Sequence, residues 1–152
     1  EKVLGSMEYG CAVAGAKLVL VLGHTRCGAV TSSVDLLAAH QTAAEATGCT
    51  NLDRLVSEIQ KSIDDADPRL STELPPEEKR SFVDSVARAH VLRTIEVIRA
   101  ESESLRRLDQ EGAIAIVGGM YDVSSGRIEF FDGNGEPAPA PDGEHGLPTP
   151  SA

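Results

Sequence analysis

The stretch "LVLVLGHTRCGA", residues 18–29, decides the fold. With Lys17 before it, the run of leucine and valine to residue 22 predicts a strand covered on both faces in a parallel sheet. Residues 23–28 form the turn out of that strand, and helical spacing continues to about residue 40. Because ligand sites in open α/β sheets lie beyond the carboxyl ends of strands, His24 and Cys27 stand where such a site is expected.

The rest of the chain alternates between helical and strand patterns. Helices are predicted over 3–14, 51–63 and 79–110, with a loop at 41–50 and a polar connector at 64–78. A buried strand is predicted over 113–117, and a strand, tight turn and strand over 121–131. This order predicts an α/β domain over residues 1–131, with a mainly parallel sheet flanked by helices. Residues 132–152 are rich in proline and glycine, and we expect this tail to be disordered.

Composition excludes several classes of partner. The 152 residues carry a formal net charge of −10, which disfavours nucleic acid and anionic lipid surfaces. No run of 18 apolar residues occurs, so no membrane segment is expected in this chain. The first residues do not resemble a secretory signal. Three sparse cysteines without a signal suit a reducing compartment, so a cytoplasmic location is expected.

Cys27 is compatible with more than one chemistry. A helix N-terminus stabilises a thiolate, and Gly23 and Gly28 allow a tight turn with close packing. A cysteine phosphatase loop would need an arginine where Ser33 stands, and no Lys-Ser/Thr pair of a phosphate-binding loop follows residue 28. A cysteine-protease dyad with His24, His40 or His90 stays formally open. On spacing alone, a metal site and a structural His/Cys pair are equally supported.

Three segments together resemble the β-class carbonic anhydrases. "SMEYGCAVAGAKLVLVLGHTRCGAV" (6–30) is similar to the family's second zinc-binding segment, and "VGGMYDVSSGRIEFF" (117–131) is similar to its closing hairpin. "ARAHVLRTIEVIRAES" (87–102) resembles a later helix, although His90-Val91 stands where the family commonly has Asn-Val. The resemblance covers about residues 3–131 and implies a β-carbonic-anhydrase-like fold that is incomplete at its N-terminus.

The resemblance implies zinc as the cofactor, held by two cysteines and one histidine. It carries over His24 and Cys27 as two of the ligands, with Gly23, Thr25 and Gly28 as near-site backbone. The third ligand belongs to an upstream Cys-x-Asp-x-Arg segment that this chain does not contain, so no catalytic residue is assigned. The remaining candidates are expected to be structural or ordinary surface residues: Cys11, Cys49, Tyr121, Asp122, His40, His90 and His145.

The implied reaction is the reversible hydration of CO2 to bicarbonate by zinc-bound hydroxide. With one ligand and the Asp-Arg pair missing, we expect this chain alone to bind zinc weakly and to be weakly active or inactive. The alternative is a non-catalytic regulatory or scaffold domain, the cytosolic part of a sulfate-permease-type bicarbonate or sulfate transporter. Family members assemble as dimers or larger oligomers, so a homodimer or higher oligomer is expected here.

Overall fold

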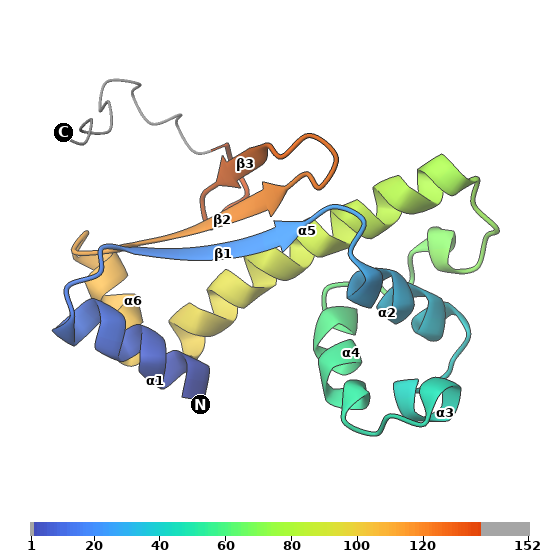
Figure 1. Ribbon diagram of the computed structural model, residues 1–152, viewed down its shortest axis with the longest axis horizontal. Helices are drawn as coiled ribbons and strands as arrows, with labels where there is room; N and C mark the ends of the chain where they lie inside the picture. The colour runs from blue at the N-terminus through green and yellow to red at the C-terminus, as the bar shows by residue number, and fades with distance from the viewer. Residues whose placement is uncertain (1, 138–152) are drawn as a thin grey trace, which may run out of the picture.

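The computed structural model describes residues 2–137, and it arranges helices around a three-stranded sheet (Figure 1). The first half of the chain contains α1 (Lys2–Glu8), the π-helical turn η1 (Tyr9–Val13), β1 (Leu18–His24), α2 (Gly28–Ala38), α3 (Ala43–Thr47) and α4 (Leu52–Gln60). The second half contains the 3-10 turn η2 (Pro68–Leu70), α5 (Pro76–Glu101), α6 (Glu103–Gln110), β2 (Ala115–Tyr121) and β3 (Ile128–Phe131). The predicted α/β class is confirmed.

The sheet has the order β1-β2-β3. β1 and β2 are parallel, with Leu18 opposite Ala115 and His24 opposite Tyr121, whereas β2 and β3 are antiparallel. The sequence predicted separate strands at 113–117 and from 121, but β2 continues unbroken through both glycines to Tyr121. The buried ring of Phe131 packs against Gly118, which explains why a residue without a side chain is tolerated inside this strand.

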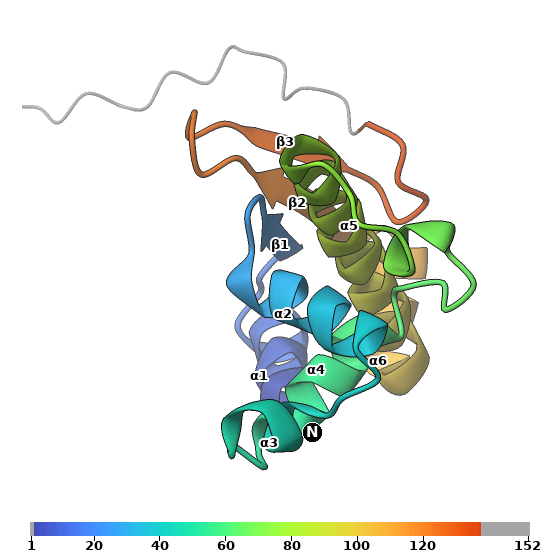
Figure 2. The same cartoon turned by 90° about the vertical axis from the view of Figure 1, so that its right-hand side faces the viewer.

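Helix α5 covers one face of β1 and β2, and no helix lies on the opposite face within residues 2–137 (Figure 2). The core lies between the sheet and the helices, where Ile95, Leu105 and Phe131 are fully buried. On the other face Leu18, Leu20 and Leu22 are 57%, 40% and 48% exposed. The prediction that β1 is covered on both faces is therefore wrong for the described residues, because the helices gather on one side.

The helix predicted over 79–110 is also wrong, since it is two helices. α5 ends at Glu101, and Ser102 takes an extended conformation and caps α6 through its side chain, which accepts from the Leu105 N–H at 3.2 Å. The apolar spacing continues across the break, so periodicity alone does not reveal it. Serine favours helix caps because its hydroxyl satisfies a free N–H at the start of a helix.

The loop predicted at 41–50 contains the short helix α3. Thr42 and Glu45 form a capping box at its start, with each side chain bonded to the other residue's backbone N–H. After β3, residues 132–137 form a turn in which Asp132 accepts the N–H groups of Asn134 and Glu136. The tail expected to be disordered was residues 132–152: residues 132–137 form this turn, and residues 138–152 lie outside the described residues. None of the described helices is both long and apolar enough to cross a membrane.

Candidate metal centre

His24 and Cys27 lie at the carboxyl end of β1, where the chain turns into α2. His24 is the last residue of the strand and is exposed, while Cys27 is half-buried and stands at the N-cap position of α2. The N-terminus of a helix favours a thiolate over a thiol, since free N–H groups and the helix dipole stabilise negative charge. The strand end and the helix start therefore place an imidazole and a thiol on one short turn.

The imidazole of His24 has a defined hydrogen bond. Its Nδ1 lies 3.0 Å from the carbonyl oxygen of Thr25. A carbonyl only accepts, so Nδ1 carries a proton, and in the neutral ring the free lone pair is then on Nε2. Metal-bound histidines typically donate their second ring N–H to a carbonyl or carboxylate in this way. The ring is thus in the tautomer that offers Nε2 to a ligand.

The turn is tied to the β2–β3 hairpin beside it (Figure 1). The Thr25 N–H donates to the Tyr121 carbonyl at 2.9 Å, and the Thr25 hydroxyl donates to Asp122 Oδ1 at 3.3 Å. Hydrogen bonds from the Ser125 side chain, and then from Ser124, hold the pKa of the Asp122 carboxyl well below its usual range. Asp122 is therefore an ionised acceptor at neutral pH.

A cavity of about 270 Å³ adjoins the turn. Its apolar lining comes from β1, α2, α4 and α5, and its polar side chains are His24, Cys27, His90 and Thr94. His90 is held by a 3.1 Å hydrogen bond between its Nδ1 and the hydroxyl of Ser62, and burial lowers the pKa of its imidazole. The structure thus brings His90, which the sequence predicted to be an ordinary residue, into the same cavity as the two predicted ligands.

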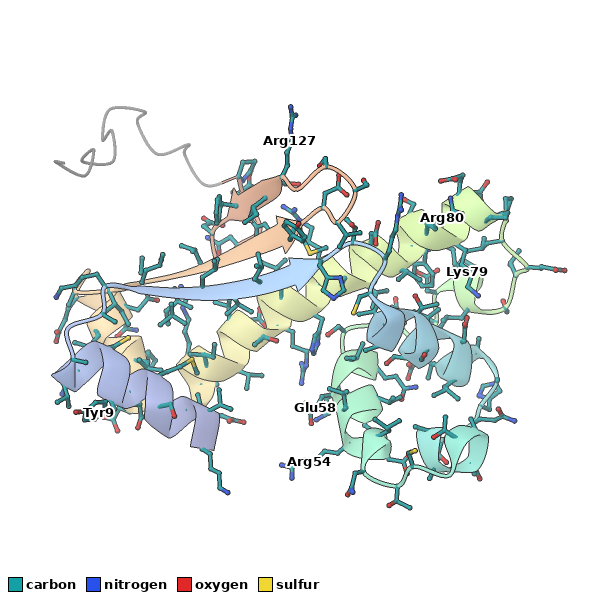
Figure 3. All side chains as sticks on the ribbon, in the orientation of Figure 1. Tyr9, Arg54, Glu58, Lys79, Arg80 and Arg127 are labelled. Carbon is teal, nitrogen blue, oxygen red and sulfur yellow. The ribbon has the colours of Figure 1, made fainter. Side chains whose placement is uncertain are left out.

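A second cavity of about 340 Å³ lies on the other side of the turn, between Arg26 and the first turns of α5. Lys79 and Arg80, labelled near that end of α5 in Figure 3, contribute to its wall. Lys79 pairs with Asp35 and Arg80 pairs with Glu77, both as exposed ion pairs. Exposed pairs of this kind contribute little to stability.

The donor set matches zinc in kind but not in number. Zinc in catalytic sites takes three protein ligands from nitrogen, sulfur and oxygen donors and keeps one open position. Across residues 2–137 no group of three or more His, Cys, Asp or Glu side chains lies close enough to hold a metal ion. Cys11 is buried in the core on η1, and Cys49 is exposed after α3. Within the described part of the chain the turn therefore offers two candidate donors, His24 and Cys27, and no third.

A family model described as carbonic anhydrase matches residues 1–128. The chain belongs to the carbonic anhydrase family. Carbonic anhydrase 2 of Mycobacterium tuberculosis is 31% identical over 130 residues, which is 86% of this chain and 56% of that protein. A carbonic anhydrase of Pseudomonas aeruginosa is 28% identical over 131 residues, which is 86% of this chain and 54% of that protein.

Solved carbonic anhydrases share the fold. A β-carbonic anhydrase of Aspergillus fumigatus, CafA, matches with a TM-score of 0.68 at 19% identity, over 88% of this chain and 57% of that one. A structure described as one of two tetrameric β-carbonic anhydrases from Sordaria macrospora matches with a TM-score of 0.65 at 18% identity, over 86% and 59%. This chain therefore spans a little over half the length of the carbonic anhydrases that it matches.

The spacing of residues along α5 indicated only weakly that this helix lines the cavity. Ala87, His90, Val91 and Thr94 are spaced i, i+3, i+4 and i+7, so they share one face of a helix, and all four line the cavity. The spacing identifies a common face but not what that face contacts. The family resemblance marked His90 only as a departure from Asn-Val.

Proposed function

We propose that this chain supplies His24 and Cys27 to the zinc centre of a β-carbonic anhydrase, whose reaction is the reversible hydration of CO2 to bicarbonate. The observation that carries the proposal is the pairing of a Nδ1-bonded imidazole with an N-cap thiol at the mouth of an apolar cavity, in a chain of this family. A small, largely apolar cavity suits a small neutral substrate such as CO2.

The third zinc ligand, on this proposal, comes from chain outside the described residues. β1 is an edge strand of the sheet in the described residues. Its outer edge therefore carries unpaired backbone N–H and C=O groups beside His24. A strand that adds to this edge in parallel would bring a donor at its carboxyl end to the same turn. The family resemblance implies that this donor is the cysteine of the Cys-x-Asp-x-Arg segment.

We also propose that the protein self-associates through the uncovered face of the sheet. Six large apolar side chains of this face are between 36% and 57% exposed: Leu18, Leu20, Leu22, Tyr121, Ile128 and Phe130. His24 continues the alternation of the three leucines, so a second copy on this face would approach the metal turn. The tetrameric description of one structural neighbour supports a second copy as the occupant.

Light scattering tests this interface. The wild-type chain should be a dimer or larger, and Leu20→Glu with Phe130→Glu should give a monomer. Val3→Glu, on the exposed surface of α1, is the matched control and should leave the assembly unchanged. A monomeric wild-type chain would contradict the proposal. A monomeric longer form of the protein would also contradict it, since its own upstream segment would then cover this face of the sheet.

The decisive experiment for the activity compares this chain with a version extended upstream, by stopped-flow CO2 hydration and zinc content. We expect the extended protein to hold zinc and to be active, and the 152-residue chain to bind zinc weakly. Full activity of the 152 residues alone would contradict the need for a third donor. An extended protein without zinc or activity would favour the regulatory or scaffold role in a transporter. We place the protein in the cytoplasm, which the unpaired state of Cys11, Cys27 and Cys49 supports.

A further inference from the structure

The turn between His24 and Cys27 is held from two sides by carboxylates of other elements. Asp122 follows β2 and lies 97 residues from Thr25 in the sequence, and Asp84 lies on α5, 58 residues from Arg26. Each carboxylate bonds one of the two residues that separate the imidazole from the thiol. The conformation of the turn therefore depends on contacts that exist only in the folded protein.

The Asp122 side of this arrangement reaches the His24 ring in two steps. The Asp122 carboxylate accepts from the Thr25 hydroxyl, and the same hydroxyl accepts from the Val123 N–H at 3.1 Å. Together with the bond between the Thr25 N–H and the Tyr121 carbonyl, these contacts fix Thr25, the residue whose own carbonyl accepts from His24 Nδ1. A displaced Thr25 would remove the acceptor that selects the tautomer of His24.

The Asp84 side fixes the residue before Cys27. Arg26 has a φ of 55°, a left-handed conformation that costs an L-residue free energy. The Asp84 carboxylate accepts from the Arg26 N–H at 2.8 Å and so stabilises this conformation. Because Arg26 directly precedes Cys27, its backbone angles set where the thiol lies relative to the imidazole.

We propose that Asp84 and Asp122 are positioning residues that pre-organise the metal-binding turn, so that Nε2 of His24 and Sγ of Cys27 can bind the same metal ion. The inference rests on the proposed function for the identity of the metal. The claim that the two carboxylates fix the conformation of the turn applies already to the metal-free chain. Groups behind a metal ligand that fix its orientation typically change metal affinity about 10- to 100-fold when they are removed.

The test measures the tautomer of His24 by nitrogen-15 NMR of the metal-free chain at pH 8. The wild-type ring should carry its proton on Nδ1, whereas Asp122→Ala should move it toward Nε2, the form that free neutral histidine favours. Asp122→Asn keeps an acceptor oxygen for the Thr25 hydroxyl and should retain the wild-type tautomer. A second measurement titrates Co²⁺ into the same proteins and into an upstream-extended version, following the thiolate-to-cobalt absorption.

In the extended protein, Asp84→Ala and Asp122→Ala should each weaken Co²⁺ binding about 10- to 100-fold, with Asn restoring it at both positions. Asp132→Ala is the matched control, since Asp132 also accepts two backbone N–H groups but lies beyond β3. An unchanged tautomer in Asp122→Ala, unchanged cobalt affinity in both alanine variants, or an equal loss in Asp132→Ala would overturn the proposal. A wild-type protein that binds no metal would contradict the proposed function, while a tautomer change in Asp122→Ala would still support the inference.

Discussion

Gly23 lies directly against Val91. A Cβ placed on Gly23 would lie 2.7 Å from Cγ2 of Val91 and 2.8 Å from Sδ of Met120. Helix α5 therefore approaches β1 closely at the residue before His24, and this close approach forms one wall of the cavity beside the turn.

Gly23→Ala should lower the free energy of unfolding by about 1–3 kcal/mol, because a methyl group inserted into a packed contact forces Val91 or the strand to shift. Urea denaturation measures the loss. Gly28→Ala is the control, since a Cβ there meets nothing within 4 Å and should be neutral or stabilising. Equal stability of the Gly23→Ala protein and the wild type would show that the contact is not tight.

Ser102→Ala should lower the free energy of unfolding by about 1–2 kcal/mol. Ser102 is 1% exposed, and its hydroxyl caps α6 and donates to Glu8 Oε1 at 2.6 Å, which ties α1 to the break between α5 and α6. Ser57→Ala, on the exposed face of α4, is the comparison and should cost nothing. Thermal unfolding followed by circular dichroism distinguishes the two, and similar melting temperatures would contradict the capping role.

Loss of stability in mild acid should depend on His90. Burial, and then the positive charge of Arg93, lower the pKa of His90 below its ordinary value of 6.5, with Glu58 opposing. The unfolded chain therefore binds a proton more readily than the native one, so stability is complete above pH 6.5 and falls as the pH drops through the lowered pKa.

His90→Gln should flatten this pH dependence, which urea midpoints at several values between pH 5 and 7.5 measure. His40→Asn, where the residue has a φ of 53° that asparagine tolerates, should keep the wild-type dependence. If the His90→Gln protein loses stability with falling pH as steeply as the wild type, another group is responsible.

Zinc binding by the upstream-extended protein should require both donors of the turn. His24→Ala and Cys27→Ala should each weaken zinc affinity by more than the roughly 10- to 100-fold that outer-shell changes cost, because each removes a direct ligand. His90→Gln should keep the zinc stoichiometry, since His90 shares the cavity without completing a three-donor group among residues 2–137. Competition with a chromophoric chelator gives the affinities, and tight zinc binding by either alanine variant would remove that residue from the ligand set.

The local sequence pattern predicted those secondary-structure elements that depend on residues adjacent in the chain. The apolar run of β1, the helical pattern that begins at residue 79 and the hairpin signal at 121–131 all predicted elements near the observed ones. The pair His24 and Cys27 was recognisable because both residues lie on one turn, so no distant contact was needed to bring them together. The break between α5 and α6 at Ser102 was not predicted, because the apolar residues keep their helical spacing across it. The only local sign of the break is the Ser102 hydroxyl that caps α6.

By itself the sequence determined the fold class, the family and the turn that carries the two donors, since strand pattern and motif are properties of contiguous residues. The tertiary structure alone decided that His90 lines the cavity beside His24 and Cys27, and that one face of the sheet stays uncovered in the described residues. It also decided that the carboxylates of Asp84 and Asp122 accept hydrogen bonds from the turn. The two carboxylate contacts join residues that lie 58 and 97 positions apart in the sequence. Periodicity within one segment carries no information about such pairs, because they form only when helix α5 and the hairpin pack against β1.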